Sequence, residues 1–384
     1  MHQQSWRSAP PAYRKVCPFS SQNFQSSVDF RRAMLWAGMM SVSPRMPQWW
    51  TASQWAVLRY FGAVDGSVTA LRLHEAIDEI DTHPKKVLSD DWGIGVGIEW
   101  LDSQFQYGYV QHGLRAMGEL QALGVASLGG KKKRGPQKCP DFICRDRNGR
   151  YHLIECKGNQ QGVSTTANQF EQGRLQKATV RFSNEQLVAQ RMVAGLAIAG
   201  CDSKWDTTLT LTDPPPDDPY DETRPHYRIE AEHPERILDA LKRAACAQGL
   251  LLSGFFDLAR RVLPESSDTR GLDEPLSHFP VSEFEANGSE WIGQVFNLPF
   301  PATLKIDAKE SAAGVRLRFG ASRDFIETAK RPSYRLTEPA NVEELDLELV
   351  PRYPSDDRPA ENQTKEASVS IQYGHFFIAD LELM

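Results

Sequence analysis

Two carboxylates and a lysine lie close together in the stretch PDFICRDRNGRYHLIECKG, residues 140–158. Its arms, 142–145 and 151–157, are rich in aromatic, β-branched and other apolar residues, and the Asn-Gly pair between them is a strong hairpin signal. Side chains alternate between the two faces of a strand, so Glu155 and Lys157 share one face of the second arm. We therefore predict a β-hairpin that carries Asp141, Glu155 and Lys157.

The register of this hairpin decides where Asp141 lies. A two-residue loop at 148–149 turns Asp141 to the face opposite to that of Glu155. A three-residue loop at 147–149, with its glycine in the left-handed bulge position, places Asp141 directly opposite Glu155. Directly opposite residues have Cβ atoms about 5 Å apart, close enough for two carboxylates to share one divalent cation. We expect the three-residue loop, with Asp146 starting the turn.

The pair Pro140-Asp141, followed by the triplet Glu155-Cys156-Lys157, resembles the signature of the PD-(D/E)XK nuclease superfamily, the restriction-endonuclease-like fold. Acid-x-Lys triplets also begin at Asp202 and Asp307. Only the triplet at 155–157 has a Pro-Asp pair at hairpin distance before it and strand-like arms around it. The resemblance covers roughly residues 95–215 and implies an α/β core, a mixed central sheet flanked by helices.

The resemblance implies a magnesium-dependent phosphodiester hydrolase in which Mn²⁺ can replace Mg²⁺. Such a site must neutralise the phosphate, lower the pKa of the attacking water and stabilise the leaving oxygen. Asp141 and Glu155 are the expected metal ligands, together with the backbone carbonyl of Cys156. Mg²⁺ suits this role because it accepts two carboxylates and keeps its remaining positions for water and phosphate. Lys157 is expected to orient or deprotonate the water.

Two further elements of the family contribute to the expected site. The helix before the core sheet often supplies another acid, and we expect Glu99 as a third metal ligand, with Glu119 behind it. An acid in the first turn of a helix can equally well complement the helix dipole. The helix after the lysine strand often carries a glutamine, for which Gln169 and Gln172 are the candidates.

A basic stretch, GGKKKRGPQK at 129–138, directly precedes Asp141 and contains no acid. It does not fit a P-loop, because the glycine spacing is wrong and Lys132 stands where Ser or Thr would bind magnesium. The whole chain has a formal net charge of -6, so contact with nucleic acid needs a local basic surface. We expect that surface to consist of Lys131, Lys132, Lys133, Arg134 and Lys138.

Composition limits the class of protein. The 384 residues are 40% hydrophobic and 10% aromatic, which is sufficient for two or three folded domains. The six cysteines form no CxxC pair, so we expect neither a disulfide framework nor a zinc ribbon, and a reducing cytoplasm is the simplest location. We also expect no membrane span, because no apolar run is long enough. HExxH and GxSxG motifs are missing from the sequence, so zinc and serine hydrolases are not supported.

The expected organisation is an N-terminal helical or irregular region at 1–94, a nuclease core at 95–215 and a C-terminal α+β domain at 216–384. The acidic, proline-rich stretch 213–225 marks the second boundary. Outside the hairpin, the patterns predict helices at 31–40, 54–61, 71–80, 167–179, 184–194, 234–248 and 255–262, and core strands at 124–128, 194–199 and 207–212. We expect the glycines at 93, 95 and 97 to form a flexible entry to a helix that runs to residue 123.

The function expected from the resemblance is a Mg²⁺-dependent endonuclease that cuts DNA, as part of a restriction or anti-phage defence system. Because a free nuclease is toxic, we expect control by a protein partner or by homo-oligomerisation through the N- and C-terminal regions. Two alternatives stay open: a catalytically idle nucleic-acid-binding or scaffold subunit, and an RNase.

Overall fold

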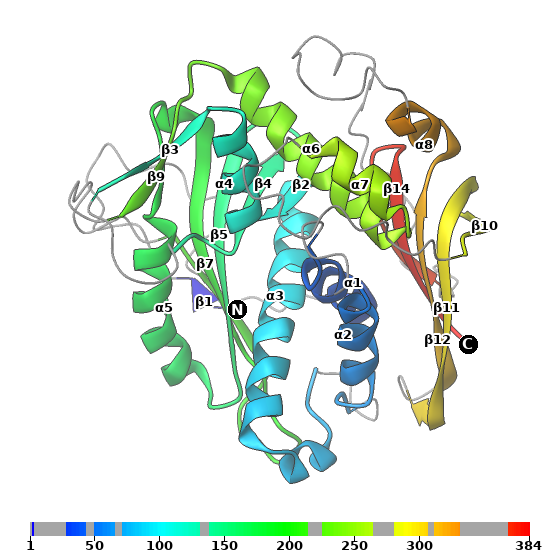
Figure 1. Ribbon diagram of the computed structural model, residues 1–384. Helices are drawn as coiled ribbons and strands as arrows, with labels where there is room; N and C mark the ends of the chain where they lie inside the picture. Colours follow the sequence, from blue (N-terminus) through cyan, green and yellow to red (C-terminus); the bar gives the residue numbers. More distant parts are fainter. Residues whose placement is uncertain are drawn as a thin grey trace, which may run out of the picture.

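A six-stranded mixed sheet occupies the left half of the computed structural model as drawn in Figure 1. The structure describes residues 2–3, 28–43, 50–65, 71–130, 138–213, 225–263, 280–305, 311–330 and 368–384. The strand order in the sheet is β1 (His2–Gln3), β8 (Thr208–Thr212), β7 (Val188–Ala197), β5 (Tyr151–Asn159), β4 (Phe142–Asp146) and β2 (Tyr107–His112). Strands β2, β4 and β5 are antiparallel neighbours. Strand β7 is parallel to β5 and follows it through helix α5 (Val163–Lys177), which gives the mixed α/β class.

Helices cover both faces of this sheet. Helix α5 packs on β5 and β7 from one side, and the long helix α3 (Thr82–Phe105) packs on the same two strands from the other side (Figure 1). A Cβ atom at Gly93 would lie 2.7 Å from the Lys157 carbonyl oxygen, and one at Gly97 would touch Cys156. The glycines predicted to form a flexible helix entry are therefore inside α3, where they allow the helix backbone to approach β5 closely.

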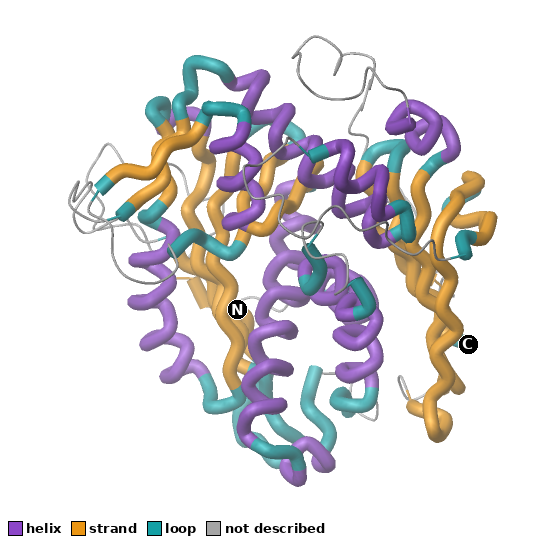
Figure 2. Tube along the Cα trace, in the orientation of Figure 1, coloured by secondary structure: helices purple, strands orange, loops and turns teal. Residues whose placement is uncertain are grey.

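A second sheet lies beyond helices α1 (Phe30–Met40) and α2 (Ala52–Phe61), on the side of α3 away from the first sheet (Figures 1 and 2). Its five antiparallel strands are ordered β10 (Ser282–Ala286), β11 (Ser289–Lys305), β12 (Ser311–Ala321), β14 (Phe377–Leu383) and β13 (Ser368–Tyr373). Helix α1 contacts α3 and also β13 and β14. Helix α6 (Pro234–Leu252) contacts β2 of the first sheet and β12 and β14 of the second, so it joins the two sheets. Helices α7 (Phe256–Val262) and α8 (Arg323–Lys330) pack against each other.

A small third sheet consists of β3 (Ala126–Gly129), β9 (His226–Ile229) and β6 (Val180–Phe182). The prediction of a core strand at 124–128 is wrong, because β3 pairs with β9 outside the central sheet. One edge strand of the six-stranded sheet is β2, which interrupts the helix predicted to reach residue 123. Helix α4 (Gly113–Ala122) follows β2 directly.

Other predictions need correction. Residues 184–194 were predicted to be a helix, but after the short 3-10 helix η5 (Glu185–Leu187) they enter strand β7, whose residues are almost all buried. Periodicity alone cannot decide whether a short apolar run forms a buried helix or a buried strand. The helix predicted at 71–80 is reduced to the 3-10 helix η4 (Glu75–Glu79). The helices predicted at 31–40, 54–61, 234–248 and 255–262 are present, with small shifts of their ends. Most of the predicted linker, residues 214–224, and the triplet at 307–309 lie outside the described residues.

The three predicted regions share a hydrophobic core. The boundary expected between residues 94 and 95 falls inside α3. One cluster of buried side chains includes Trp36, Ile154 and Leu381, one from each region. Among the described residues, no helix is long and apolar enough to cross a membrane.

Candidate active site

The hairpin of β4 and β5 has the three-residue loop. Phe142 pairs with Ile154, and the register continues without a shift to Arg145 opposite Tyr151. The Asp146 carbonyl accepts from the Gly149 amide at 3.0 Å, and Gly149 has a φ angle of +79°, a conformation that favours glycine. The predicted register is confirmed, and its continuation places Asp141 directly opposite Glu155.

Each of the two carboxylates accepts a hydrogen bond from the other strand. The Cys156 amide donates to Asp141 Oδ2 at 2.8 Å, and the Asp141 amide donates to Glu155 Oε2 at 3.2 Å. Lys157 Nζ donates to Glu155 Oε1, the second oxygen of that carboxylate. The structure therefore brings together the three residues that the sequence predicted as catalytic.

Burial raises the pKa of Glu155 to about 8, and the neighbouring Asp141 adds to this effect while Lys157 opposes it. Burial also raises the pKa of Asp141. For Lys157 the attraction of both carboxylates exceeds the effect of burial, so its pKa is raised and the ammonium stays protonated at neutral pH. Two acids stand beside one ammonium group, so the site favours one further positive charge, either a proton or a cation.

Pro140 has a specific effect on the backbone beside this pair. The register continues to Pro140 opposite Cys156, whose N–H points toward the β4 side because it donates to Asp141. In an antiparallel pair the N–H and C=O of one residue point to the same side. Proline has no N–H, so position 140 donates no ladder hydrogen bond to the Cys156 carbonyl. That oxygen is therefore a suitable third ligand beside the two carboxylates.

Sequence reasoning missed Asp90, an exposed residue of α3. Burial raises the pKa of Asp90, and Lys86 and Lys157 oppose this effect. The charge of Asp90 in turn adds to the raised pKa of Asp141, so Asp90 is within electrostatic range of the site. Asp90 lies three and seven residues before Gly93 and Gly97, on the helix stripe that faces β5. This spacing is visible in the sequence, but its meaning depends on the helix starting at Thr82.

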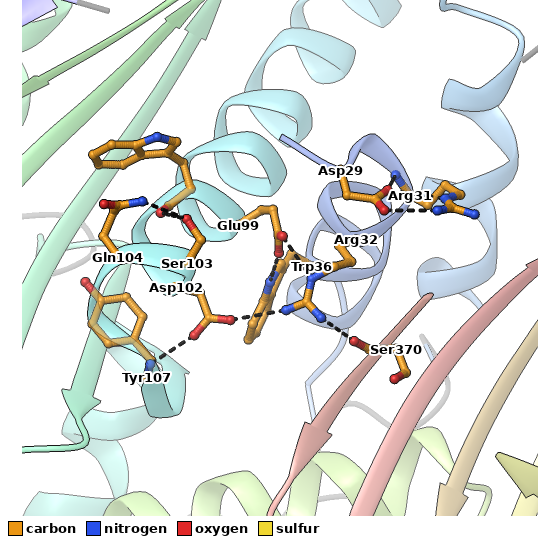
Figure 3. Close-up of polar contacts among 11 residues, drawn as sticks. Asp29, Arg31, Arg32, Trp36, Glu99, Asp102, Ser103, Gln104, Tyr107 and Ser370 are labelled. Atoms are coloured by element: carbon orange, nitrogen blue, oxygen red, sulfur yellow. Dashed lines mark hydrogen bonds and ion pairs between the residues drawn. The ribbon is translucent and has the colours of Figure 1, made fainter. Parts of the chain in front are cut away.

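Glu99 does not join the pair, contrary to the prediction. Glu99 comes nine residues after Asp90 on α3, which places it about 13 Å further along the helix and on the opposite side of it. Glu99 therefore points away from the stripe of Asp90. Figure 3 shows its carboxylate directed at helix α1. Arg32 Nε donates to Glu99 Oε1 at 2.8 Å, and Trp36 Nε1 donates to Oε2 at 3.1 Å. Both oxygens of Glu99 are thus engaged in holding α1 against α3. Glu119 is buried on α4.

The two glutamine candidates on α5 differ. The Gln169 amide bonds to the end of β5, because its Nε2 donates to the Gly158 carbonyl at 3.1 Å and its Oε1 accepts from Asn159 at 3.2 Å. Gln172 is exposed. Of the predicted basic surface, residues 131–134 lie outside the described part of the chain, and Lys138 is exposed.

The arrangement fits a hard divalent cation. The donors are two carboxylates and the backbone carbonyl of Cys156, all oxygen ligands, as Mg²⁺ prefers. Within the part of the chain that the structure describes, no group of three or more His, Cys, Asp or Glu side chains is gathered to hold a metal ion. Mg²⁺ tolerates this because it commonly keeps several waters and binds through one or two carboxylates. Comparison of the chain with protein-family models, curated proteins and solved structures found no match.

Proposed function

We propose that this protein is a metal-dependent endonuclease of the PD-(D/E)XK type that hydrolyses phosphodiester bonds in DNA. The observation that carries the proposal is the direct opposition of Asp141 and Glu155 on one hairpin, with Lys157 bonded to Glu155. The two other acid-x-Lys triplets lack such a partner in the sequence, so the hairpin supplies what the bare motif does not.

The order of elements supports the same proposal. Among the elements that form or cover the six-stranded sheet, helix α3 precedes the three antiparallel strands β2, β4 and β5, which precede helix α5 and the parallel strand β7. Helix, strands, helix and strand is the succession expected of a restriction-endonuclease-like core. Glu155 and Lys157 lie on β5 and Asp141 directly precedes β4, so a rigid sheet determines their spacing.

The chemistry follows from these positions. A bound Mg²⁺ ion would neutralise the phosphate and lower the pKa of the attacking water, and Mn²⁺ should replace it. Asp141, Glu155 and the Cys156 carbonyl would hold that ion. Lys157 is protonated beside the two acids, which suits it to orient the water and to stabilise negative charge on the phosphate. Asp90 adds a negative charge at the edge of the site and favours cation binding there.

The biological setting belongs to the same proposal. We place the enzyme in the cytoplasm as part of a restriction or anti-phage defence system, controlled by a protein partner or by self-association. The free cysteines 139, 144, 156, 201 and 246 are consistent with a reducing compartment. The basic stretch before Asp141 would contact the DNA backbone.

The test is cleavage of supercoiled plasmid by the purified protein with Mg²⁺, Mn²⁺ or a chelator. We expect Asp141→Ala, Glu155→Ala and Lys157→Ala each to lower the cleavage rate by at least about 100-fold, as the removal of one transition-state contact does. The matched control is the triplet at 202–204, whose Asp202 and Lys204 are exposed. The variants Asp202→Ala and Lys204→Ala should cut like the wild type.

Three outcomes would change the assignment. Site variants that cut at the wild-type rate would exclude this active site. Cleavage of matched RNA but not of DNA would make the protein an RNase. DNA binding by a wild-type protein that cuts neither substrate would favour the idle nucleic-acid-binding subunit.

A further inference from the structure

One buried asparagine joins the catalytic strand to the helix that covers it. Asn159 is the last residue of β5, two positions after Lys157, and is 7% exposed. Its Oδ1 accepts from the amides of Gln161 and Gly162 at 2.9 and 3.0 Å. Its Nδ2 donates to Thr166 Oγ1 at 2.8 Å and to Gln169 Oε1 at 3.2 Å. A single side chain therefore connects the strand, the turn after it and the first two turns of α5.

Gln169 closes this connection into a ring. Its Oε1 accepts from Asn159, and its Nε2 donates back to the carbonyl of Gly158 on the same strand. Helix α5 cannot slide along β5 without breaking bonds to both residues. Buried polar groups that lose a partner are costly, so this network specifies one position of the helix.

The position of α5 matters because the helix touches a predicted metal ligand. Gly173 lies one turn beyond Gln169, and a Cβ atom there would be 3.2 Å from Cγ of Glu155 and 2.7 Å from Cγ1 of Val193. The Glu155 side chain therefore lies directly under the helix backbone. A shift of α5 would either press on this carboxylate or release it.

We infer that Asn159 is a positioning residue, which holds α5 in the register that fixes the Glu155 carboxylate against the Asp141 amide. The role of this arrangement in cation binding rests on the proposed function, in which Glu155 is a metal ligand. A carboxylate with a fixed conformation loses little conformational entropy when it binds a cation. Gly173 is the contact through which the helix acts.

The first readout needs neither metal nor DNA. The Asp141 amide donates to Glu155 Oε2, so its hydrogen exchange, measured by NMR on the full-length protein, reports where Glu155 lies. We expect Asn159→Ala to accelerate this exchange about tenfold, the ratio expected from the loss of one hydrogen bond. Asn184→Ala is the matched control, because Asn184 also accepts from a nearby amide, that of Gln186, at the start of the short helix η5.

A second variant separates position from stability. Gly173→Ala adds only a methyl group and raises helix propensity, yet we expect the same faster exchange at Asp141 because the methyl meets Glu155 and Val193. Combining Val193→Ala with Gly173→Ala should restore part of the protection of the Asp141 amide from exchange, because it removes the side chain that the new methyl group approaches most closely. Gly118→Ala on α4, where nothing lies within 4 Å, is the control and should change nothing.

The second readout is the affinity for Mn²⁺ measured by calorimetry, with cleavage kinetics alongside. We expect Asn159→Ala and Gly173→Ala to weaken Mn²⁺ binding about tenfold and to lower kcat without changing KM for DNA. Folded variants with wild-type exchange at Asp141 and wild-type Mn²⁺ affinity would overturn the inference. If the variants show faster exchange at Asp141 but the wild-type protein cuts no nucleic acid, the proposed function is overturned and the positioning role stays supported.

Discussion

Two clusters in this molecule each combine two carboxylates with one basic side chain. Between α1 and α3, Arg32 lies between Glu99 and Asp102 (Figure 3). On the hairpin, Lys157 lies beside Glu155 and its opposite residue Asp141. The composition is nearly the same, so the difference between the clusters must come from their hydrogen bonds and surroundings.

In the helix cluster every carboxylate oxygen has a partner. Glu99 accepts from Arg32 and Trp36, and Asp102 accepts from Arg32 at 3.3 Å and from the Tyr107 amide at 2.9 Å. Arg32 also donates to the carbonyl of Ser370 on the edge strand β13, at 2.5 Å. Arginine has five donors in a fixed fork, so it can serve three acceptors in one geometry. The cluster joins α1, α3 and the second sheet and leaves no oxygen for a ligand.

The hairpin cluster retains spare capacity. Among the described residues, nothing donates to Asp141 Oδ1, and the Lys157 side chain is 21% exposed. A flexible ammonium group can leave Glu155 when a cation arrives, because lysine is a point charge on a long chain and arginine is a rigid fork. Two acidic side chains and one basic side chain therefore stabilise the packing of α1 on α3, but form a candidate site on the hairpin. The difference is that the hairpin cluster has an unused acceptor oxygen and is accessible to solvent.

The largest effect expected from this comparison concerns stability. Arg32→Met leaves two buried carboxylates without their cation and should lower the free energy of unfolding by about 3–5 kcal/mol. Arg31→Met is the control on the next residue, because Arg31 pairs with the more exposed Asp29 and should cost at most about 1 kcal/mol. Urea unfolding of both variants measures the difference. Equal losses would mean that the Arg32 cluster is no stronger than a surface ion pair.

The next effect is the pH dependence of cation binding at the hairpin. Glu155, with its pKa near 8, holds a proton at neutral pH that a cation must displace. Apparent Mn²⁺ affinity should therefore rise about tenfold per pH unit below pH 8 and level off above it. Calorimetry between pH 6.5 and 8.5 tests this, with Glu155→Gln as the reference that lacks the titrating group. A flat affinity across this range would contradict it.

The smallest effect distinguishes the missed acid, Asp90, from the two proposed metal ligands. Asp90→Asn removes a charge at the edge of the site, so we expect the Mg²⁺ concentration for half-maximal cleavage to rise only several-fold. Asp78→Asn is the control, because Asp78 is also exposed and pairs with Lys85. A loss of activity as large as that of Asp141→Ala would make Asp90 a direct ligand.

The hairpin could be predicted because its determinants are local. The turn residues and the alternation of side chains limit the register to two choices within about twenty residues of chain, and the observed pairing of Phe142 with Ile154 is the one that we expected. The same reasoning failed for residues 184–194, because an apolar run of that length suits a buried strand as well as a helix.

The third acid could not be chosen by local reasoning. Glu99 and Asp90 both lie on α3, and which of them faces β5 depends on where the helix packs. The glycines at 93 and 97 mark the stripe that approaches the sheet, whereas Gly95 and Glu99 mark the stripe that faces α1. Without knowledge of how α1 packs, the glycines at 93, 95 and 97 suggest a flexible entry to a helix, and Glu99 suggests a metal ligand.

By itself, the sequence determined the hairpin and the shared face of Glu155 and Lys157, because a turn and a period of two residues specify them, and it predicted the opposition of Asp141 and Glu155 through the three-residue loop. Only the tertiary structure decided that Arg32 engages Glu99, that Asp90 stands at the edge of the candidate site and that Asn159 ties α5 to β5. These contacts join segments that are far apart in the sequence. Their packing depends on the whole hydrophobic core, so no local sequence pattern specifies it.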